Sequence, residues 1–410
     1  MTNTVYSPLT LPNGTQLPNR LAKAAMEENM AAIGHLPGET IFKLYDAWAN
    51  GGSGLLITGN VMVDHRAMTG PGGIALEQDT PLKPFKEWAA IAKQNGTHIW
   101  MQINHPGRQV YAAMGGQVLS PSNIPLDMGP HSKLFGQPTA MTEREIGELI
   151  QRFATTSIKA IEAGFDGIQV HAAHGYLLSQ FLSPLTNQRT DQWGGSLDNR
   201  ARLLYQIIEA IQKVVPKETA IAVKLNSADF QRGGFDSEDA LAVVKKLEEL
   251  NIDLVELSGG SYESPAMQGI TKDGRTLNRE AYFLTFAKEI AKQASIPIMT
   301  TGGINSLATA QKVINEGVHM IGMGRALAFC PTLPNDWKKD GNAQAALPSV
   351  TWKNKTLGSL ATMAITKRQL QRIGKGKQPK LNSSPLFSLI ADQIRLKKLT
   401  KLYKARYSND

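Results

Sequence analysis

The chain has 410 residues, 42% of them hydrophobic and 19% charged, with a formal net charge of +9. This length and composition exclude a disordered tail or a peptide module, because the chain can bury one large core or two ordinary ones. Its single cysteine, Cys330, excludes a disulfide framework, a Cys-ligated iron–sulfur cluster and a four-Cys zinc site, since each needs several thiolates. The N-terminal segment has no apolar signal region and no later run is long enough to span a membrane, so we expect a cytoplasmic protein.

The positive charge is concentrated at the C-terminal end of the chain. Residues 338–410 hold 16 Lys and Arg against 3 Asp and Glu, so the rest of the chain is mildly acidic. Because the chain also lacks zinc-finger spacing and RNP-like aromatic motifs, we expect no nucleic-acid partner.

Short apolar runs alternate with helical stretches between residues 20 and 325, and this alternation is typical of repeated βα units with a parallel sheet. Eight such units in about 300 residues predict a (β/α)8 TIM barrel, with a doubly wound sheet as the alternative. The predicted strands are Leu21–Ala25, Gly54–Thr58, His98–Ile103, Gly167–His171, Ala220–Leu225, Leu254–Ser258, Pro297–Thr301 and Met320–Gly324.

Several predicted helices carry capping signals. Thr142 and Glu145 have the spacing of a capping box, and the amphipathic run that follows ends at Gly164. Ser237 and Ser306 each open a further helical stretch. These signals place helices after the third, fifth and seventh predicted strands or close to them.

Two parts of the chain fall outside the repeated units. Gly115–Pro138 is too rich in Pro and Gly for a helix, so we expect a loop over one face of the barrel. Thr356–Arg372 and Leu386–Tyr407 are predicted as helices, the second strongly basic. We therefore predict a barrel over residues 1–335 and a basic helical extension over residues 336–410, packed on the barrel or on a neighbouring subunit.

The fourth predicted strand ends in a cluster of side chains that can carry chemistry. In a (β/α)8 barrel the reactive groups lie at the C-terminal ends of strands and in the loops that follow. His171, His174 and Tyr176 fall at such an end. Two neutral imidazole N–H groups aimed at one oxygen would stabilise negative charge on it, and a nearby phenol could deliver a proton. The alternative is that all three are packing residues.

Charged and glycine residues at other strand ends suggest a bound cofactor. Lys224 lies among apolar residues and needs a negative partner, either a carboxylate of another strand or an electron-rich cofactor ring. Gly302, Gly303 and Gly324 suit a backbone-lined phosphate site after the last two strands, and Arg325 could grip the phosphate. No dinucleotide-binding or P-loop motif occurs, and we expect no metal site.

These residues belong to longer segments that resemble the old yellow enzyme family of flavin-dependent ene-reductases, or NADH:flavin oxidoreductases. The resemblance spans residues 5–335 and is carried by Asn19-Arg20, by Gln102 with the segment 105–108, and by the segments 171–184 and 187–200. It implies a (β/α)8 barrel that binds FMN non-covalently at its C-terminal mouth. Because one cysteine cannot hold an iron–sulfur cluster, the chain resembles the members that use FMN alone.

The resemblance also implies roles for single residues. His171 and His174 would bind the oxygen of an α,β-unsaturated carbonyl or nitro compound, and Tyr176 would protonate the α-carbon after hydride transfer from flavin N5. NADH or NADPH would reduce the flavin in the same site. The residues implied to contact FMN are Gln102 at the pyrimidine, Lys224 near N1, Gly302, Gly303, Gly324 and Arg325 at the phosphate, and Ala25, Met26, Asn60 and His171 beside the ring.

One position departs from the family pattern. Where many relatives place Thr or Cys close to the flavin after the first strand, this chain reads Ala24-Ala25-Met26-Glu27-Glu28-Asn29, without either residue type. If Glu27 faces the flavin, its charge would disfavour the reduced anion; if it turns away, it is only a loop carboxylate.

The sequence thus favours an FMN-dependent NAD(P)H oxidoreductase that reduces small activated alkenes, and a homo-oligomer is compatible with it. Two alternatives stay open. One is a flavin-free, phosphate-binding barrel that acts as a lyase or isomerase. The other is a barrel scaffold whose basic tail binds a partner or a membrane surface.

Overall fold

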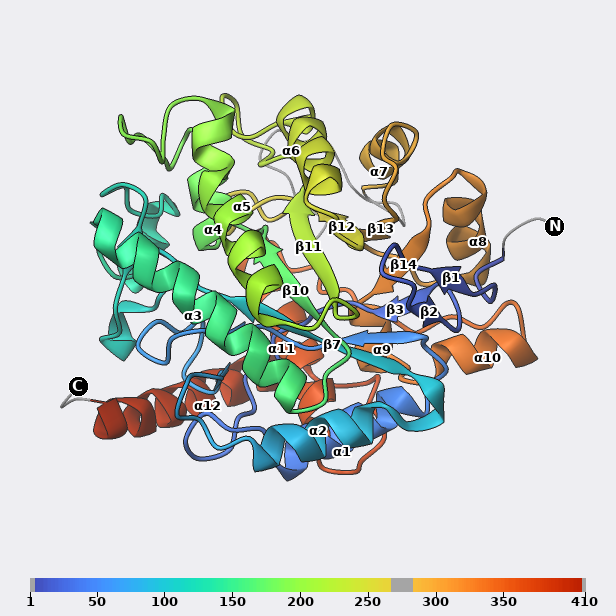
Figure 1. Ribbon diagram of the computed structural model, residues 1–410. Coiled ribbons are helices and arrows are strands. Elements are labelled where there is room, and N and C mark those ends of the chain that lie inside the picture. Colours follow the sequence, from blue (N-terminus) through green and yellow to red (C-terminus); the bar gives the residue numbers. More distant parts are fainter. Residues whose placement is uncertain (1–3, 267–282, 408–410) are drawn as a thin grey trace.

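Eight parallel strands form a closed barrel in the computed structural model, which describes residues 4–266 and 283–407 (Figure 1). The order β10-β11-β12-β13-β14-β3-β4-β7 returns to β10 through a β7–β10 pairing. The predicted (β/α)8 barrel is therefore confirmed, and the doubly wound alternative is wrong. The barrel strands are β3 (Leu21–Lys23), β4 (Leu55–Ile57), β7 (His98–Asn104), β10 (Gly167–Ala172), β11 (Ala220–Asn226), β12 (Leu254–Ser258), β13 (Ile298–Thr301) and β14 (Met320–Met323).

An apolar plug fills the N-terminal end of the barrel. The antiparallel hairpin of β1 (Leu9–Thr10) and β2 (Gln16–Leu17) contributes Leu9 and Leu17, which cluster with residues near the strand starts such as Trp100. A fully buried leucine is stabilising by about 1.5–3 kcal/mol. Because apolar side chains occupy this end, the polar inward-facing residues lie toward the opposite end, where the site is expected.

Helices surround the barrel (Figure 1). Capping interactions fix where several of them begin. They are α1 (Glu39–Ala49), α2 (Lys83–Ala92), α3 (Glu143–Glu162), α4 (Leu177–Leu182), α5 (Leu197–Val214), α6 (Ser237–Glu249), α7 (Leu284–Ala291), α8 (Leu307–Asn315) and α9 (Arg325–Phe329).

The capping predictions are confirmed for two helices and corrected for a third. Thr142 and Glu145 form the reciprocal capping box of α3, and the Ser306 side chain accepts from a backbone N–H at the start of α8. At α6 the capping residue is Asp236 and not Ser237. The Asp236 carboxylate accepts from the N–H groups of the second and third helical residues, which a carboxylate does well at a helix start.

Short elements extend the loops at the C-terminal mouth. β5 (Val61–Met62) pairs with β7 and with β6 (Ile74–Ala75). The 3-10 helix η2 (Ala112–Met114) follows β7. The segment predicted as a loop, 115–138, holds only β8 (Leu119–Ser120), which pairs with β9 (Thr139–Ala140), and the 3-10 helix η3 (Gly129–Leu134).

The C-terminal part forms α10 (Leu333–Lys339), α11 (Lys355–Ile373) and α12 (Pro385–Tyr407). The two long helices cover the stretches predicted as helical. In Figure 1, α12 lies next to loops from the N-terminal part of the chain. Within the described residues, no helix combines the length and the apolar character needed to cross a membrane. The division of the chain at residue 335 stays a prediction.

Aromatic contacts hold α12 against the loops that follow β3 and β5. The Tyr403 hydroxyl donates to the backbone oxygen of His65 at 2.8 Å. The ring centroid of His35 lies 5.5 Å from that of Tyr403 and 5.3 Å from that of Tyr407. Because Tyr403 is only 5% exposed, its ring is the main anchor of this end of the helix.

We expect Tyr403→Ala to release the end of α12, since truncating a buried aromatic ring costs about 3 kcal/mol or more. The adjacent Leu402 is 58% exposed, so Leu402→Ala is a matched control that should change little. Limited trypsin digestion of the lysine-rich tail measures the release. Equal digestion of the two variants would contradict the docking described here.

Candidate active site at the mouth of the barrel

The end of β10 brings three of the predicted site residues together. The ring centroids of His171 and His174 are 5.1 Å apart, and those of His171 and Tyr176 are 4.9 Å apart. His174 has a left-handed backbone (φ 61°), as does Gly175 after it (φ 72°). This sharp turn, which glycine tolerates readily, folds the loop back so that both imidazoles and the phenol share one side of the mouth.

Both imidazoles are held in the neutral form. Burial lowers the pKa of His171 well below its ordinary value, and the charges of His174 and Lys224 add to the shift. The pKa of His174 is lowered in the same way by burial and by Lys224. His171 Nδ1 accepts from the Ala173 N–H at 3.2 Å, so its proton sits on Nε2. A neutral His171 is therefore a hydrogen-bond donor through Nε2.

Neighbouring strands position the His174 loop. The backbone N–H of His174 donates to Asn226 Oδ1 at 3.1 Å, and its Nε2 lies 2.7 Å from Ser258 Oγ. Asn226 ends β11 and Ser258 ends β12. The loop after one strand is thus fixed by the ends of the next two, which gives the imidazole a defined orientation.

Tyr176 stays protonated at neutral pH. Burial raises its pKa above the ordinary value, and the charge of Glu27 raises it further. Its hydroxyl lies 3.1 Å from the hydroxyl of Tyr262, in the loop after β12. We did not predict Tyr262 from the sequence, although it follows a strand end and a Gly-Gly-Ser turn, where site residues of a barrel are expected.

The sequence suggested two kinds of partner for Lys224, a carboxylate of another strand or a cofactor ring, and the carboxylate is present. Its Nζ lies 2.7 Å from Glu256 Oε1, and the two side chains are 2% and 0% exposed. The other oxygen of Glu256 accepts from Gln169, whose own oxygen accepts from the Gln102 amide at 2.7 Å. Strand register explains the chain of contacts, because His171 pairs with Lys224, Lys224 with Glu256, and Gln102 with Gln169.

A second buried ion pair lies between β3 and α1, against Tyr45 and Trp48, and was missed by sequence reasoning. Lys23 Nζ lies 3.6 Å from Glu28 Oε1, and Lys23 is fully buried. Tyr45 donates to Glu28 at 2.6 Å and accepts from Lys23 at 3.2 Å. Burial lowers the pKa of Lys23 to about 8, against the opposing effect of Glu28, and the charge of Lys224 contributes. A lysine inside an apolar strand was the signal that could have revealed it.

The predicted phosphate loops are neighbours. β13 and β14 pair side by side, and the Thr301 hydroxyl donates to the Gly322 oxygen at 3.0 Å. Gly302 and Gly303 have φ values of 124° and 73°, which favour glycine. Gly324 precedes α9, and a Cβ there would lie 3.4 Å from the Met26 side chain. Arg325 donates to the backbone oxygen of Pro348 in the C-terminal part.

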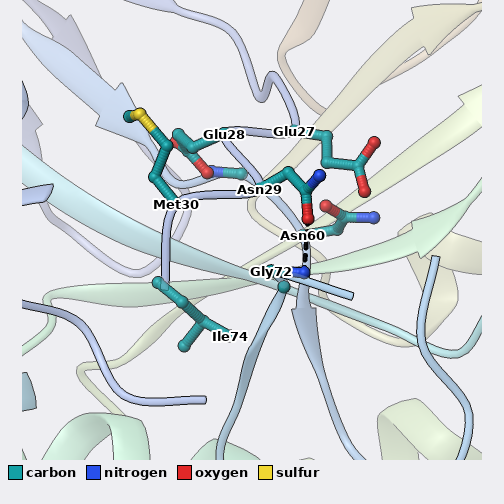
Figure 2. A pocket seen from close by; sticks show the side chains of 9 residues that line it. Glu27, Glu28, Asn29, Met30, Asn60, Gly72 and Ile74 are labelled. Carbon is teal, nitrogen blue, oxygen red and sulfur yellow. Dashed lines mark hydrogen bonds between the residues drawn. The ribbon is translucent and has the colours of Figure 1, made fainter. Parts of the chain in front are cut away.

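Asn60 and Glu27 line a small pocket after β3 and β4 (Figure 2). The Asn60 amide donates to the Thr69 hydroxyl at 3.2 Å, and that hydroxyl donates to Glu27 Oε1 at 2.7 Å. On the other wall, Asn29 Oδ1 accepts from the Gly72 N–H at 2.6 Å, the dashed line in Figure 2. Ala25 and Met26, which precede Glu27 in the loop after β3, are partly buried.

Barrel enzymes have this arrangement, a closed (β/α)8 barrel with polar side chains gathered at its C-terminal mouth. Comparison with known proteins shows to which enzyme family the chain belongs. The profile of the NADH:flavin oxidoreductase / NADH oxidase family matches residues 4–344. The chain is 36% identical over 386 residues to an NADH-dependent flavin oxidoreductase of Hypocrea jecorina, a match that covers 86% of this chain and 95% of that protein. The chain therefore belongs to the NADH:flavin oxidoreductase family.

Two further relatives agree with this assignment. The chain is 34% identical over 330 residues to the NADH oxidase of Thermoanaerobacter brockii and spans 48% of that protein's length. The structure of an old yellow enzyme homologue from Zymomonas mobilis superposes with a TM-score of 0.70 and 25% identity, covering 83% of this chain and 94% of that one. The predicted family, enzyme class and FMN cofactor with a nicotinamide reductant are confirmed, which excludes the flavin-free and non-enzymatic alternatives.

One orphaned side chain supports the fit of FMN at this mouth. Asn104 ends β7, two residues after Gln102 and on the same face of the strand. It is fully buried, yet neither atom of its side-chain amide has a hydrogen-bond partner among the described residues. Buried amides are normally satisfied, so this one fits a polar ligand in the mouth. In the sequence, Asn104 stands out only because it lies between Gln102 and the segment 105–108, which carry the family resemblance.

The Lys224–Glu256 pair can be tested through stability. Glu256→Gln leaves the Lys224 charge buried without a counter-charge, which costs about 3–5 kcal/mol. Replacing both residues, Lys224→Met with Glu256→Gln, should recover most of the loss. Denaturant unfolding of the FMN-free protein measures both changes, and a Glu256→Gln variant as stable as the unchanged protein would contradict this account of the pair.

Proposed function

We propose that the chain reduces the C=C bond of α,β-unsaturated compounds activated by a carbonyl or nitro group, with NADH or NADPH as reductant. The observation that carries this proposal is the convergence of two neutral imidazoles and one protonated phenol at the end of β10. Such a set can bind an oxygen, stabilise the negative charge that develops on it, and supply one proton to the neighbouring carbon.

Bound FMN would supply the hydride chemistry that couples oxidation of the nicotinamide to reduction of the alkene. The residues that would hold FMN are those implied by the family resemblance, with Gln102 and Lys224 at the ring and Gly303, Gly324 and Arg325 at the phosphate. Asn104 joins this set because its amide has no partner among the described residues.

In the proposed mechanism the substrate oxygen accepts hydrogen bonds from His171 and His174. Because these imidazoles are neutral, they polarise the substrate as donors without giving up a proton. Tyr176 then delivers its hydroxyl proton to the α-carbon. The Tyr262 hydroxyl lies 3.1 Å from that of Tyr176, so it can donate a hydrogen bond to the resulting phenolate until a proton from solvent restores Tyr176.

Removing both donors tests the oxygen-binding role. His171→Ala with His174→Ala should keep FMN but weaken the binding of a phenol such as 4-hydroxybenzaldehyde by about 100-fold, since two hydrogen bonds worth roughly 1.5 kcal/mol each are lost. The spectral change of the bound flavin during ligand titration measures this. The conservative pair His171→Asn and His174→Asn keeps two donors and should bind more tightly than the alanine pair. Loss of FMN itself from the alanine pair would show an anchoring role instead.

Replacing Tyr176 with Phe tests the proton-donor role. Positioned general acids contribute about 10²–10⁴-fold to a rate, so reoxidation of the flavin by 2-cyclohexenone should slow by that order. Reduction of the flavin by NADH needs no such proton and should be little changed. Stopped-flow measurement separates the two half-reactions, and Tyr262→Phe is the matched control with the smaller expected effect. Equal slowing of both half-reactions in Tyr176→Phe would refute the assignment.

A further inference from the structure

Helix α12 lies at the edge of the molecule in Figure 1, with one face on the protein and the other in solvent. On the inner face, Ser388 and Tyr403 are buried, and the Arg395 guanidinium between them donates to the backbone oxygen of Asn29 at 2.6 Å. Because an α-helix has 3.6 residues per turn, a second line of side chains points the opposite way. This outer stripe consists of Phe387, Ile390, Ile394, Lys397, Lys398 and Lys401.

The first half of the outer stripe is apolar. Phe387, Ile390 and Ile394 are 57%, 49% and 66% exposed. Of the twelve large hydrophobic side chains that are exposed among the described residues, nine belong to the C-terminal extension, between Leu357 and Leu402. Single exposed apolar residues are scattered over most soluble proteins, whereas a concentration of them marks a surface that binds a partner or a membrane. The extension therefore carries a binding surface.

The second half of the outer stripe is basic. Lys397, Lys398 and Lys401 continue the same line along the helix, and all three are exposed. None of the three has an ion-pair partner among the described residues. Asp392 is the one acidic residue of α12, and its carboxylate is paired with Lys367 of α11 at 3.8 Å. The outer face thus presents uncompensated positive charge directly after its apolar side chains.

The charge around the apolar half indicates which partner suits this face. Residues 338–410 hold 16 Lys and Arg against 3 Asp and Glu, and the Arg368 guanidinium of α11 lies 4.6 Å from the centre of the Phe387 ring. A second copy of the chain would bring the same positive charge to the face, because a two-fold interface joins identical surfaces. An anionic bilayer complements both halves, since its acyl region takes up apolar side chains and its headgroups attract lysines.

We propose that the outer stripe of α12 binds the protein to the surface of an anionic membrane. The apolar half enters the boundary between headgroups and acyl chains, and the three lysines bind the anionic headgroups. The helix lies on the surface, because its inner face stays packed on the protein. That inner face contacts Asn29 and His65 in loops at the barrel mouth, so the bound state holds these loops one helix diameter, about 10 Å, from the lipid.

The test is co-sedimentation of the full-length, FMN-loaded protein with unilamellar vesicles. Vesicles that contain phosphatidylserine besides phosphatidylcholine should bind the protein, and vesicles of phosphatidylcholine alone should bind it far more weakly. Added salt should weaken the binding to the anionic vesicles, because salt screens exposed charges. Equal binding to both kinds of vesicle, or binding to neither, would overturn the proposal.

The basic half is tested by removing two lysines of the outer stripe. Lys397→Gln with Lys401→Gln should weaken binding to the anionic vesicles about 20-fold, since each lysine at an anionic surface contributes roughly fivefold. The matched control is Lys213→Gln with Lys217→Gln, which removes two exposed lysines of the same spacing at the end of α5. The control should bind as the unchanged protein does. Equal weakening in the two double variants would contradict a specific role of α12.

The apolar half is tested by Ile390→Ser with Ile394→Ser. This variant should bind the anionic vesicles at least about tenfold more weakly, because two isoleucine side chains no longer leave water. Val214→Ser, at an apolar position of α5 that is 43% exposed, should bind normally. Substitutions at exposed positions change stability little, so all variants should keep the thermal unfolding temperature and the flavin spectrum. An isoleucine variant that binds as tightly as the unchanged protein would refute insertion of this face.

Two further results would assign the outer stripe to another partner. Binding of polyglutamate without binding of anionic vesicles would show that the face recognises an acidic protein. A dimer that Ile390→Ser with Ile394→Ser converts into a monomer in light scattering, again without vesicle binding, would show an interface between copies of the chain. Either result overturns the membrane proposal, and neither affects the proposed function, which is tested by alkene reduction without lipid.

Discussion

The ion pair between Lys224 and Glu256 inside the barrel is the constraint on which the active site depends. A lysine 2% exposed and a glutamate fully buried are tolerated only because they neutralise each other and because the remaining oxygen of the glutamate is hydrogen-bonded. Strand register makes the pairing possible, since the two residues lie opposite each other on adjacent parallel strands. Moving β11 by one residue would turn Lys224 out of the barrel.

Lys224 also affects the imidazoles near it. Its charge adds to burial in lowering the pKa of His171 and His174, so both effects favour the neutral form of the two imidazoles. The charge of Glu27 likewise adds to burial in raising the pKa of Tyr176. Neutral donors and a protonated phenol thus arise chiefly from burial, and the fixed charges of Lys224 and Glu27 add to it.

Features that depend on neighbouring residues could be predicted from the sequence. Features that form between distant segments were missed. The eight strands were found because apolar runs with turn signals are local, and His171, His174 and Tyr176 were found because they lie in six consecutive positions. Tyr262, the Lys23–Glu28 pair and the orphaned Asn104 were missed, because their significance depends on which strands become neighbours. The capping residue of α6 was misplaced by one position, since an aspartate and a serine stand side by side there and both can cap.

The C-terminal extension shows the same limit. Its composition revealed its positive charge, and its apolar periodicity predicted its helices. Neither property showed that the Tyr403 hydroxyl would bind the backbone of His65. The two possibilities for Glu27 also needed the structure, in which its carboxylate accepts from the Thr69 hydroxyl and lines the small pocket of Figure 2.

The most direct test of the central claim is the visible absorption spectrum of the purified, FMN-loaded protein without oxygen. The account predicts that NADH or NADPH bleaches the flavin band and that 2-cyclohexenone then restores it. A flavin that is bleached by the nicotinamide but not restored by any activated alkene would contradict the assignment of His171, His174 and Tyr176 to alkene reduction.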